Sequence, residues 1–163
     1  MNDLSPTEVL ARLPQRRPML FVDEILAVDS QRIVGVYTWK DEDCDGHFPG
    51  NPVVPGVKLV EMCSQVGNVA WGIWHTASKT TPEESNPKAG FFTEIERGDF
   101  KRMVRPGDKV TCQATFDKDG ALRGDKIVTH VKIQFLGGPR DSETAFEGKT
   151  CADWAPSRPQ VIK

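Results

Sequence analysis

Long apolar runs are missing from this sequence, and so is a strong charge of either sign. No stretch approaches the roughly 20 apolar residues of a membrane-spanning helix, and residues 1–20 lack the apolar centre of a signal peptide. The 21 Lys and Arg nearly balance the 23 Asp and Glu, so the formal net charge is only -2. We therefore expect a cytoplasmic protein with no membrane span and no general attraction to nucleic acid.

Cysteine is also sparse and scattered. The sequence has four cysteines, and none of them forms a CxxC pair: Cys44, Cys63, Cys112 and Cys151. This spacing argues against a zinc site and gives no disulfide framework for a chain of this size. We expect thiols without a chemical role and no bound metal.

The length and composition indicate one globular domain. A chain of 163 residues, 38% hydrophobic and 27% charged, is long enough for one core and short for two domains. We therefore predict a single domain over residues 1–163. Its one long helical pattern covers residues 56–74 and is apolar on most sides, which is typical of a buried helix. Small residues at Ser64, Gly67 and Ala70 would let another backbone approach closely.

Segments rich in strand-forming residues surround this helix and are separated by short Gly- and Pro-containing turns. The predicted strands cover residues 19–28, 32–39, 90–95, 99–104, 109–116, 126–135 and 143–153. Short turns favour antiparallel pairing, so we predict an α+β fold with one long central helix. Residues 76–89 are expected to form a surface loop, and residues 154–163 a loose tail.

A short helix is predicted near the N-terminus. Ser5 is a suitable N-cap, Pro6 suits the first helical position, and Glu8 completes a capping box. Pro14 is expected to end this helix about two turns later.

Residues 45–65, DGHFPGNPVVPGVKLVEMCSQ, combine Gly and Pro residues with one histidine and lead directly into the helix. The prolines restrict the shape of the loop. Gly56 stands at the helix entrance, where the backbone amides have no intrahelical partner. Such an amide is suited to hold a carbonyl oxygen that gains negative charge.

Glu61 interrupts the apolar pattern of the helix, and polar residues share its side at helical spacing: Lys58, Ser64, Gln65 and Asn68. This stripe is either the solvated face of an amphipathic helix or part of a site, and periodicity alone does not decide between them. His47 by itself is a weaker signal still, since a lone loop histidine is more often structural or solvated than catalytic.

Together, these residues resemble the signature of 3-hydroxyacyl-[acyl-carrier-protein] dehydratases of the FabZ and FabA type. That signature is His-Phe-Pro-Gly, one variable residue and Pro, then Pro-Gly and a helix that bears an acid. Here His47-Phe48-Pro49-Gly50-Asn51-Pro52 is followed by Pro55-Gly56 and Glu61. Two further segments resemble the family, LPQRRPMLFVDEI at residues 13–25 and FKRMVRPGD at residues 100–108. Agreement in several ordered pieces is far more specific than one short motif.

The resemblance implies a hotdog fold and a homodimer in which His47 of one subunit faces Glu61 of the partner subunit. It implies that one of the two removes the C2 proton and the other protonates the leaving hydroxyl, with His47 preferred as the base. Gln65 would orient Glu61, and the Gly56 amide would hold the thioester oxygen. The substrate would be carried on the phosphopantetheine of an acyl carrier protein, with no other cofactor. A glutamate rather than an aspartate resembles the FabZ branch.

The acyl chain requires an apolar channel, for which the candidates are Phe48, Val53, Val54, Met62, Phe91 and Phe92. The carrier protein is acidic in this family, so basic residues of the second segment are candidates for docking: Lys101, Arg102 and Arg105. The alternatives are ordinary core for the first set and a solvated strand face for the second.

The sequence departs from the family pattern at Lys58, Arg17 and Met103, where an apolar residue, an aromatic residue and a proline are usual. These departures bear on substrate and partner more than on chemistry, and favour a specialised biosynthetic pathway. Two other functions stay open at this point. One is a hotdog thioesterase or CoA-linked hydratase, and the other is a non-catalytic acyl-binding subunit. The sequence predicts neither the acyl chain length nor any assembly beyond the dimer.

Overall fold

A computed structural model of the protein describes residues 3–77, 88–116, 122–123 and 126–156. The helical elements are α1 (Pro6–Ala11), the 3-10 turn η1 (Asp41–Cys44), α2 (Gly56–Ser64), the π-helical η2 (Gln65–Ala70) and α3 (Trp71–Ala77). The strands are β1 (Glu24–Val28), β2 (Arg32–Thr38), β3 (Lys88–Phe100), β4 (Lys109–Thr115), β5 (Leu122–Arg123), β6 (Lys126–Phe135) and β7 (Thr144–Pro156).

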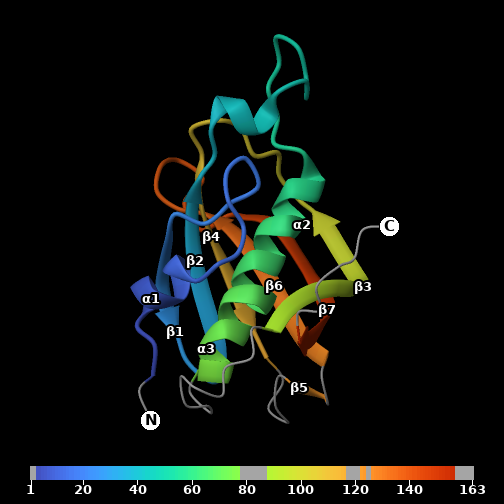
Figure 1. The fold of residues 1–163 in the computed structure, drawn as a ribbon. Helices are drawn as coiled ribbons and strands as arrows, with labels where there is room; N and C mark the ends of the chain where they lie inside the picture. The colour runs from blue at the N-terminus through green and yellow to red at the C-terminus, as the bar shows by residue number, and fades with distance from the viewer. Residues whose placement is uncertain (1–2, 78–87, 117–121, 124–125, 157–163) are drawn as a thin grey trace, which may run out of the picture.

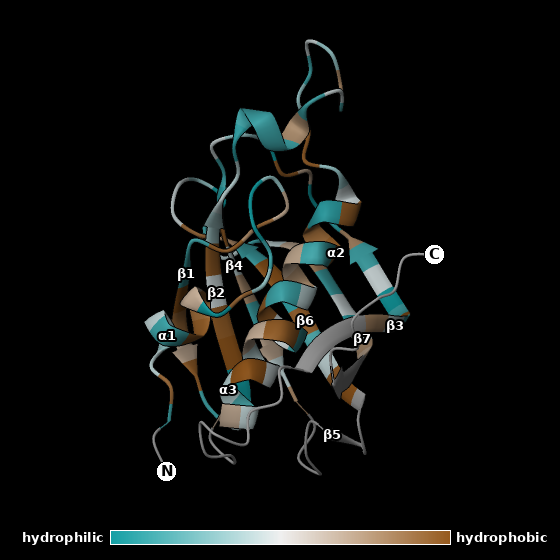
Figure 2. Cartoon of the chain, viewed as in Figure 1, coloured by the Kyte–Doolittle hydropathy of each residue, from teal (hydrophilic) through white to brown (hydrophobic). Residues whose placement is uncertain are grey.

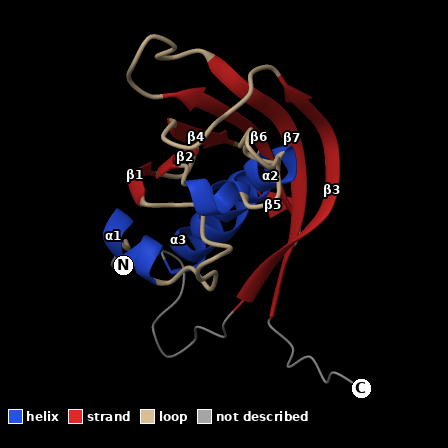
Figure 3. Cartoon of the chain, turned by 90° about the horizontal axis from the view of Figure 1, so that it is seen from above, coloured by secondary structure: helices blue, strands red, loops and turns tan. Residues whose placement is uncertain are grey.

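The strands form one antiparallel sheet that curves around a long helix (Figures 1 and 3). The order across the sheet is β1-β2-β4-β6-β7-β3, and β5 pairs with β6 beside this path. The α+β arrangement predicted from the sequence is therefore confirmed. Because β3 ends the path, its outer edge pairs with no other strand of the described chain.

The long helix consists of α2, η2 and α3, which follow one another without a break from Gly56 to Ala77. Its side chains pack on apolar residues of the strands, which Figure 2 shows in brown. A Cβ atom added at Gly67 would lie 2.9 Å from the Cβ of Ala114 in β4. The predicted close approach of backbones is thus present at Gly67, and a larger residue there would push the helix away from the sheet.

The polar stripe on this helix is not a solvated face. Ser64, Gln65 and Asn68 are all buried. The Oδ1 atom of Asn68 accepts a hydrogen bond from Thr129 of β6 at 3.1 Å, and the hydroxyls of Thr129 and Thr150 lie 2.9 Å apart. The amphipathic interpretation is therefore wrong for these residues, because they are buried rather than solvated.

The predicted division of residues 90–104 into two strands is also wrong. The structure has one strand, β3, from Lys88 to Phe100. Its pairing with β7 shifts register between Phe92 and Glu94 and again between Ile95 and Arg97. These bulges absorb extra residues while the strand continues, so the strand passes through residues 96–98 without a break.

Three other boundaries differ from the prediction. Residues 76–77 belong to α3 and residues 88–89 to β3, and the rest of the predicted surface loop lies outside the described residues. Residues 154–156 of the predicted tail pair with β3 as the end of β7, and the remainder of the tail also lies outside the description. Strand β1 starts at Glu24 rather than residue 19, because the preceding backbone is hydrogen-bonded by a helix side chain described below.

The N-terminal capping box is confirmed. The Ser5 hydroxyl accepts from the Glu8 amide at 3.3 Å, and the Glu8 carboxylate accepts from the Ser5 amide at 2.8 Å. The helix ends at Ala11, before Pro14. In the described part of the chain no helix is long and apolar enough to span a membrane. The four cysteines are buried, and the burial of Cys63 raises the pKa of its thiol well above the ordinary value.

Candidate active site

Residues 45–55 form a compact loop between η1 and the start of α2 (Figure 1). The His47 amide donates to Cys44 O at 2.8 Å, and the His47 carbonyl accepts from the Val53 amide at 2.9 Å. Gly46 and Gly50 have φ angles of +78° and +73°, a region that glycine occupies without strain. The loop is therefore fixed by its own backbone, as its Gly and Pro content predicted.

The ring of His47 has a defined proton arrangement. Its Nδ1 atom lies 2.8 Å from Val53 O, and a carbonyl oxygen can only accept a hydrogen bond. Nδ1 therefore carries a hydrogen, and the lone pair of Nε2 is available in the neutral ring. The ring also stacks on Phe48 with centroids 4.0 Å apart, so its orientation is restrained from two sides. This arrangement suits a general base.

Glu61 is held by Gln65, which lies one turn further along the helix. The Nε2 atom of Gln65 donates to Glu61 Oε1 at 3.0 Å, so the predicted i,i+4 hydrogen bond is present. The same amide donates to Met19 O at 2.6 Å and accepts from the Phe21 amide at 2.8 Å. Gln65 is 0% exposed, and its amide has one possible orientation because the Phe21 amide can only donate.

His47 and Glu61 do not meet within one chain. Neither a hydrogen bond nor an ion pair joins them in the described part of the structure, where each instead contacts its own holding group. Each chain thus presents a histidine with an available Nε2 atom and a carboxylate that its helix holds in place.

Gly56 is the first residue of α2, where the backbone amides have no intrahelical acceptor. A Cβ atom at this position would lie 2.7 Å from the ring of Phe100, at the end of β3. The lack of a side chain at Gly56 therefore lets the Phe100 ring pack against the helix start. The oxyanion role of Gly56 stays a prediction, which rests on the unpaired amides of a helix start.

The candidate channel residues have different surroundings. Val53, Val54 and Met62 are buried, Phe92 is half-buried and Phe48 is exposed, while the side chain of Phe91 is outside the description. A hollow of about 570 Å³ lies elsewhere, on β3, β4, β6 and β7, and polar residues such as Gln113, His130 and Lys149 line it. Its lining includes neither His47 nor Glu61, so we do not identify it with the acyl channel.

The three candidate docking cations are exposed and already have partners. Lys101 lies 2.9 Å from Glu147, and Arg102 lies 3.7 Å from Glu143. Arg105 differs, because its Nη1 atom donates to Asn51 Oδ1 at 2.9 Å and to Pro52 O at 3.2 Å. Arg105 therefore supports the His47 loop, a role that the sequence did not suggest.

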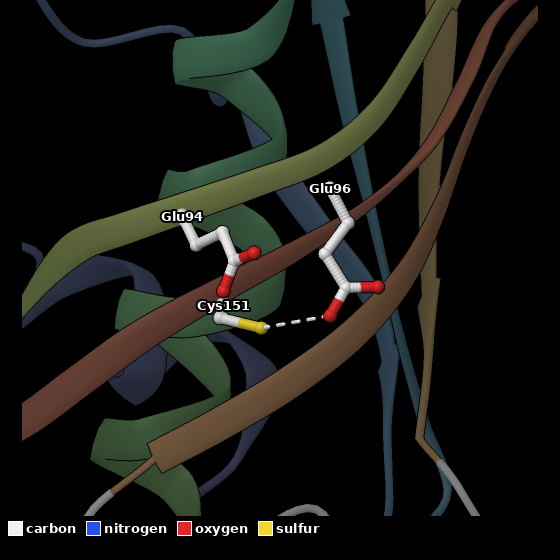
Figure 4. Close-up of side chains that lie close together, drawn as sticks. All are labelled: Glu94, Glu96 and Cys151. Atoms are coloured by element: carbon white, nitrogen blue, oxygen red, sulfur yellow. Dashed lines mark hydrogen bonds between the residues drawn. The ribbon is translucent and has the colours of Figure 1, made fainter.

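Three side chains elsewhere have the types that bind metals: Glu94, Glu96 and Cys151 (Figure 4). Their ligand atoms lie within 4.8 Å of one another, on β3 and β7. Glu96 is also ion-paired with Lys149 at 2.9 Å and accepts from the Cys151 thiol at 3.9 Å. Two of the three side chains are thus engaged by neighbours, and we assign no metal to the group.

A buried polar group supports η1 beside the loop. The Asp43 carboxylate is buried and accepts from the Tyr37 hydroxyl at 2.8 Å and from the Lys40 amide at 2.9 Å. Arg17 donates to the Tyr37 hydroxyl in turn. Burial raises the pKa of Tyr37 far above its ordinary value, so Tyr37 stays a neutral donor to Asp43.

Comparison with known proteins identifies the family of this chain. Residues 37–124 match the ApeI-like family, described as ApeI dehydratase. The 3-hydroxyacyl-[acyl-carrier-protein] dehydratase FabZ of Oenococcus oeni is 40% identical over 118 residues, which is 71% of this chain and 79% of the relative. The FabZ of Caulobacter vibrioides is 38% identical over 144 residues, or 81% and 87% of the two chains.

Solved structures show the same hotdog fold. The ApeI:P dehydratase heterocomplex of Xenorhabdus doucetiae has a TM-score of 0.71 at 16% identity, over 98% of this chain and 96% of that one. A thioesterase of Haemophilus influenzae has a TM-score of 0.66 at 15% identity, over 98% and 96%. The fold is thus common to enzymes of different activity, and the sequence relatives decide the family. The chain belongs to the FabZ and ApeI-like family of 3-hydroxyacyl-[acyl-carrier-protein] dehydratases.

Proposed function

We propose that this protein removes water from 3-hydroxyacyl thioesters carried by acyl carrier protein and forms trans-2-enoyl thioesters. The observation that carries the proposal is the hydrogen bond between His47 Nδ1 and Val53 O, which leaves Nε2 available as a base. The FabZ relatives support the substrate class by their activity. The HFPG loop and the helix that bears Glu61 favour dehydration over thioester hydrolysis.

In the proposed reaction, His47 Nε2 takes the proton from C2 of the substrate. The electron pair of that bond moves toward the thioester carbonyl, and the amide of Gly56 holds the oxygen that gains charge. Glu61, in its protonated form, then gives a proton to the C3 hydroxyl, which leaves as water while the C2–C3 double bond forms. His47 ends protonated and Glu61 ionised, and one proton moved from His47 to Glu61 restores the starting state.

The proposed site is shared between two copies of the chain. Large apolar side chains around the start of α2 and its loop are 53–76% exposed in a single chain: Phe48, Val57, Phe100 and Met103. The neighbouring strand β3 has its outer edge without a strand partner in the described chain. A second copy placed against this edge would cover the apolar residues and bring its Glu61 toward His47.

Pairing with a different hotdog chain is the second candidate. It is favoured by one observation, that the ApeI structure with a TM-score of 0.71 is a heterocomplex. In that case the chain would supply its residues to a site completed by another protein.

The test of activity is mass-spectrometric detection of water loss from a panel of 3-hydroxyacyl chains on carrier protein and on CoA. Wild type is compared with His47→Ala and Glu61→Gln, and with His130→Ala as a control on the exposed side of β6. Water loss by wild type and the control, but by neither site variant, supports the proposal. Release of free acid in place of enoyl product would identify a thioesterase.

The test of shared sites mixes the two inactive variants. In a homodimer with sites built from both chains, a mixed dimer has one intact site and one site without either group. Random exchange makes half of the dimers mixed, so about a quarter of wild-type activity returns. Activity that stays at the level of the separate variants would contradict sharing between copies, and would favour a heterologous partner.

A further inference from the structure

Lys58 is a departure from the family pattern that lies next to the proposed site. It stands in the first turn of α2, three residues before Glu61, and its side chain is half-buried. Its Nζ atom donates to the backbone carbonyl of Asp43 at 2.7 Å. The ammonium also lies 5.7 Å from the centroid of the Phe21 ring. The helix start is thus bonded to η1.

The acceptor of this bond belongs to a firmly held turn. Through its buried carboxylate, Asp43 accepts hydrogen bonds from Tyr37 of β2 and from the Lys40 amide. Arg17, a second departure from the family pattern, supports the same turn through the Tyr37 hydroxyl. Two unusual cations of the sequence therefore act on one short element, η1.

The carbonyl of Cys44, which follows Asp43, holds the His47 loop. Cys44 O accepts from the His47 amide at 2.8 Å, while the preceding carbonyl, Asp43 O, accepts from Lys58 at 2.7 Å. Consecutive carbonyls of η1 thus bind the histidine loop and the glutamate helix. The hydrogen bond from Lys58 to Asp43 therefore joins the two ends of the segment of residues 44–57.

We propose that Lys58 is a positioning residue that ties the Glu61 helix to the origin of the His47 loop and so limits the motion of the loop. An apolar side chain at this position would pack against Phe21 but would leave the two ends of the segment of residues 44–57 unconnected. A closed loop samples fewer conformations than an open one, so Nε2 of His47 stays where the reaction needs it. The inference deepens the proposed dehydration and rests on it for its effect on rate.

The experiment compares Lys58→Met, which keeps an apolar stem, with Lys58→Arg, which keeps a donor. Lys109→Met, at an exposed lysine of β4, is the matched control. Hydrogen–deuterium exchange of peptides covering residues 44–54 measures loop closure in the absence of substrate. Steady-state kinetics on the preferred carrier-bound substrate then give kcat and KM as a function of pH.

We expect Lys58→Met to exchange about tenfold faster in residues 44–54, with the sheet unchanged, and kcat to fall about tenfold to a hundredfold with little change in KM. Lys58→Arg should recover most of both effects, and Lys109→Met should match wild type. Unchanged exchange in Lys58→Met overturns the proposal. So does a shift in the pH profile of kcat without faster exchange, because that result would assign Lys58 an electrostatic effect on Glu61 instead. If Lys58→Met exchanges faster but wild type dehydrates no substrate, the positioning role is kept and the proposed function is rejected.

Discussion

The two members of the proposed reacting pair are held by different kinds of structure. Glu61 stands on a buried helix and is bound by Gln65, a fully buried side chain that also bonds the backbone at Met19 and Phe21. His47 stands on a loop whose shape comes from its own backbone hydrogen bonds and from the hydrogen bonds of two cations, Lys58 and Arg105.

This difference separates stability from activity on the two sides of the site. The contacts that orient Glu61 are also contacts of the core, so their loss affects folding and catalysis together. The contacts that orient His47 lie at or near the surface, so their loss affects catalysis while the fold persists. The following predictions test that contrast, from the largest expected effect to the smallest.

The largest effect is expected for His47→Ala. Removal of a general base lowers kcat by about 100-fold to 10,000-fold, while the free energy of unfolding changes by about 0.5 kcal/mol or less at this half-exposed loop position. Steady-state kinetics and urea unfolding measure the two quantities. A large decrease in the free energy of unfolding would mean that the contacts of His47 are part of the core.

The next effect is expected for Gln65→Leu. The variant leaves the buried Phe21 amide without its partner and also removes the bond to the exposed residue Met19, which together cost about 1–3 kcal/mol in the free energy of unfolding. It also frees Glu61, so kcat falls about tenfold. Gln113→Leu, at a half-buried glutamine of β4, serves as the control. If Gln65→Leu lost activity but kept the wild-type free energy of unfolding, the contrast between the contacts of Glu61 and those of His47 would be wrong.

A smaller effect is expected for Arg105→Gln, measured against Arg102→Gln. Because Arg105 bonds Asn51 and Pro52, its loss loosens the His47 loop and lowers kcat about twofold to fivefold, with unchanged stability. If Arg105 instead serves only in carrier docking, KM rises, the rise depends on salt, and Arg102→Gln behaves in the same way.

The smallest effect is expected for Glu8→Gln, at a capping box remote from both residues in sequence. Hydrogen bonds from the Ser5 amide and hydroxyl lower the pKa of Glu8 below its ordinary value. The stability that this carboxylate contributes is therefore present above its unfolded pKa and is lost as the pH falls through the folded value. We expect a slight decrease in Tm at pH 7 that disappears in acid, with kcat unchanged. A change in kcat would show that α1 influences the site.

Contacts between near neighbours in the chain were the ones that the sequence predicted. The capping box at Ser5 and Glu8 and the hydrogen bond from Gln65 to Glu61 both follow from residue types at fixed helical spacing. The sheet and the long helix were predicted for the same reason, since their hydrophobic patterns are local.

The sequence did not predict how the site is supported over longer separations. Gln65 bonds backbone groups 44 and 46 positions away, and Arg105 bonds the loop across 53 and 54 positions. Three of these four partners are backbone amide or carbonyl groups, which carry no residue-type signal because nearly every residue has both. Such contacts appear only when the fold brings the segments together.

The hydrogen bonds among Asn68, Thr129 and Thr150 have a further consequence for how β6 and β7 align. In the observed pairing Thr129 lies opposite Thr150, and both hydroxyls face the helix. A slip of β7 by one position would reverse its two faces, turning Thr150 to the outside and the charged side chains of Glu147 and Lys149 into the core. The paired hydroxyls inside the sheet and the charged side chains outside it therefore favour the same alignment of β6 with β7.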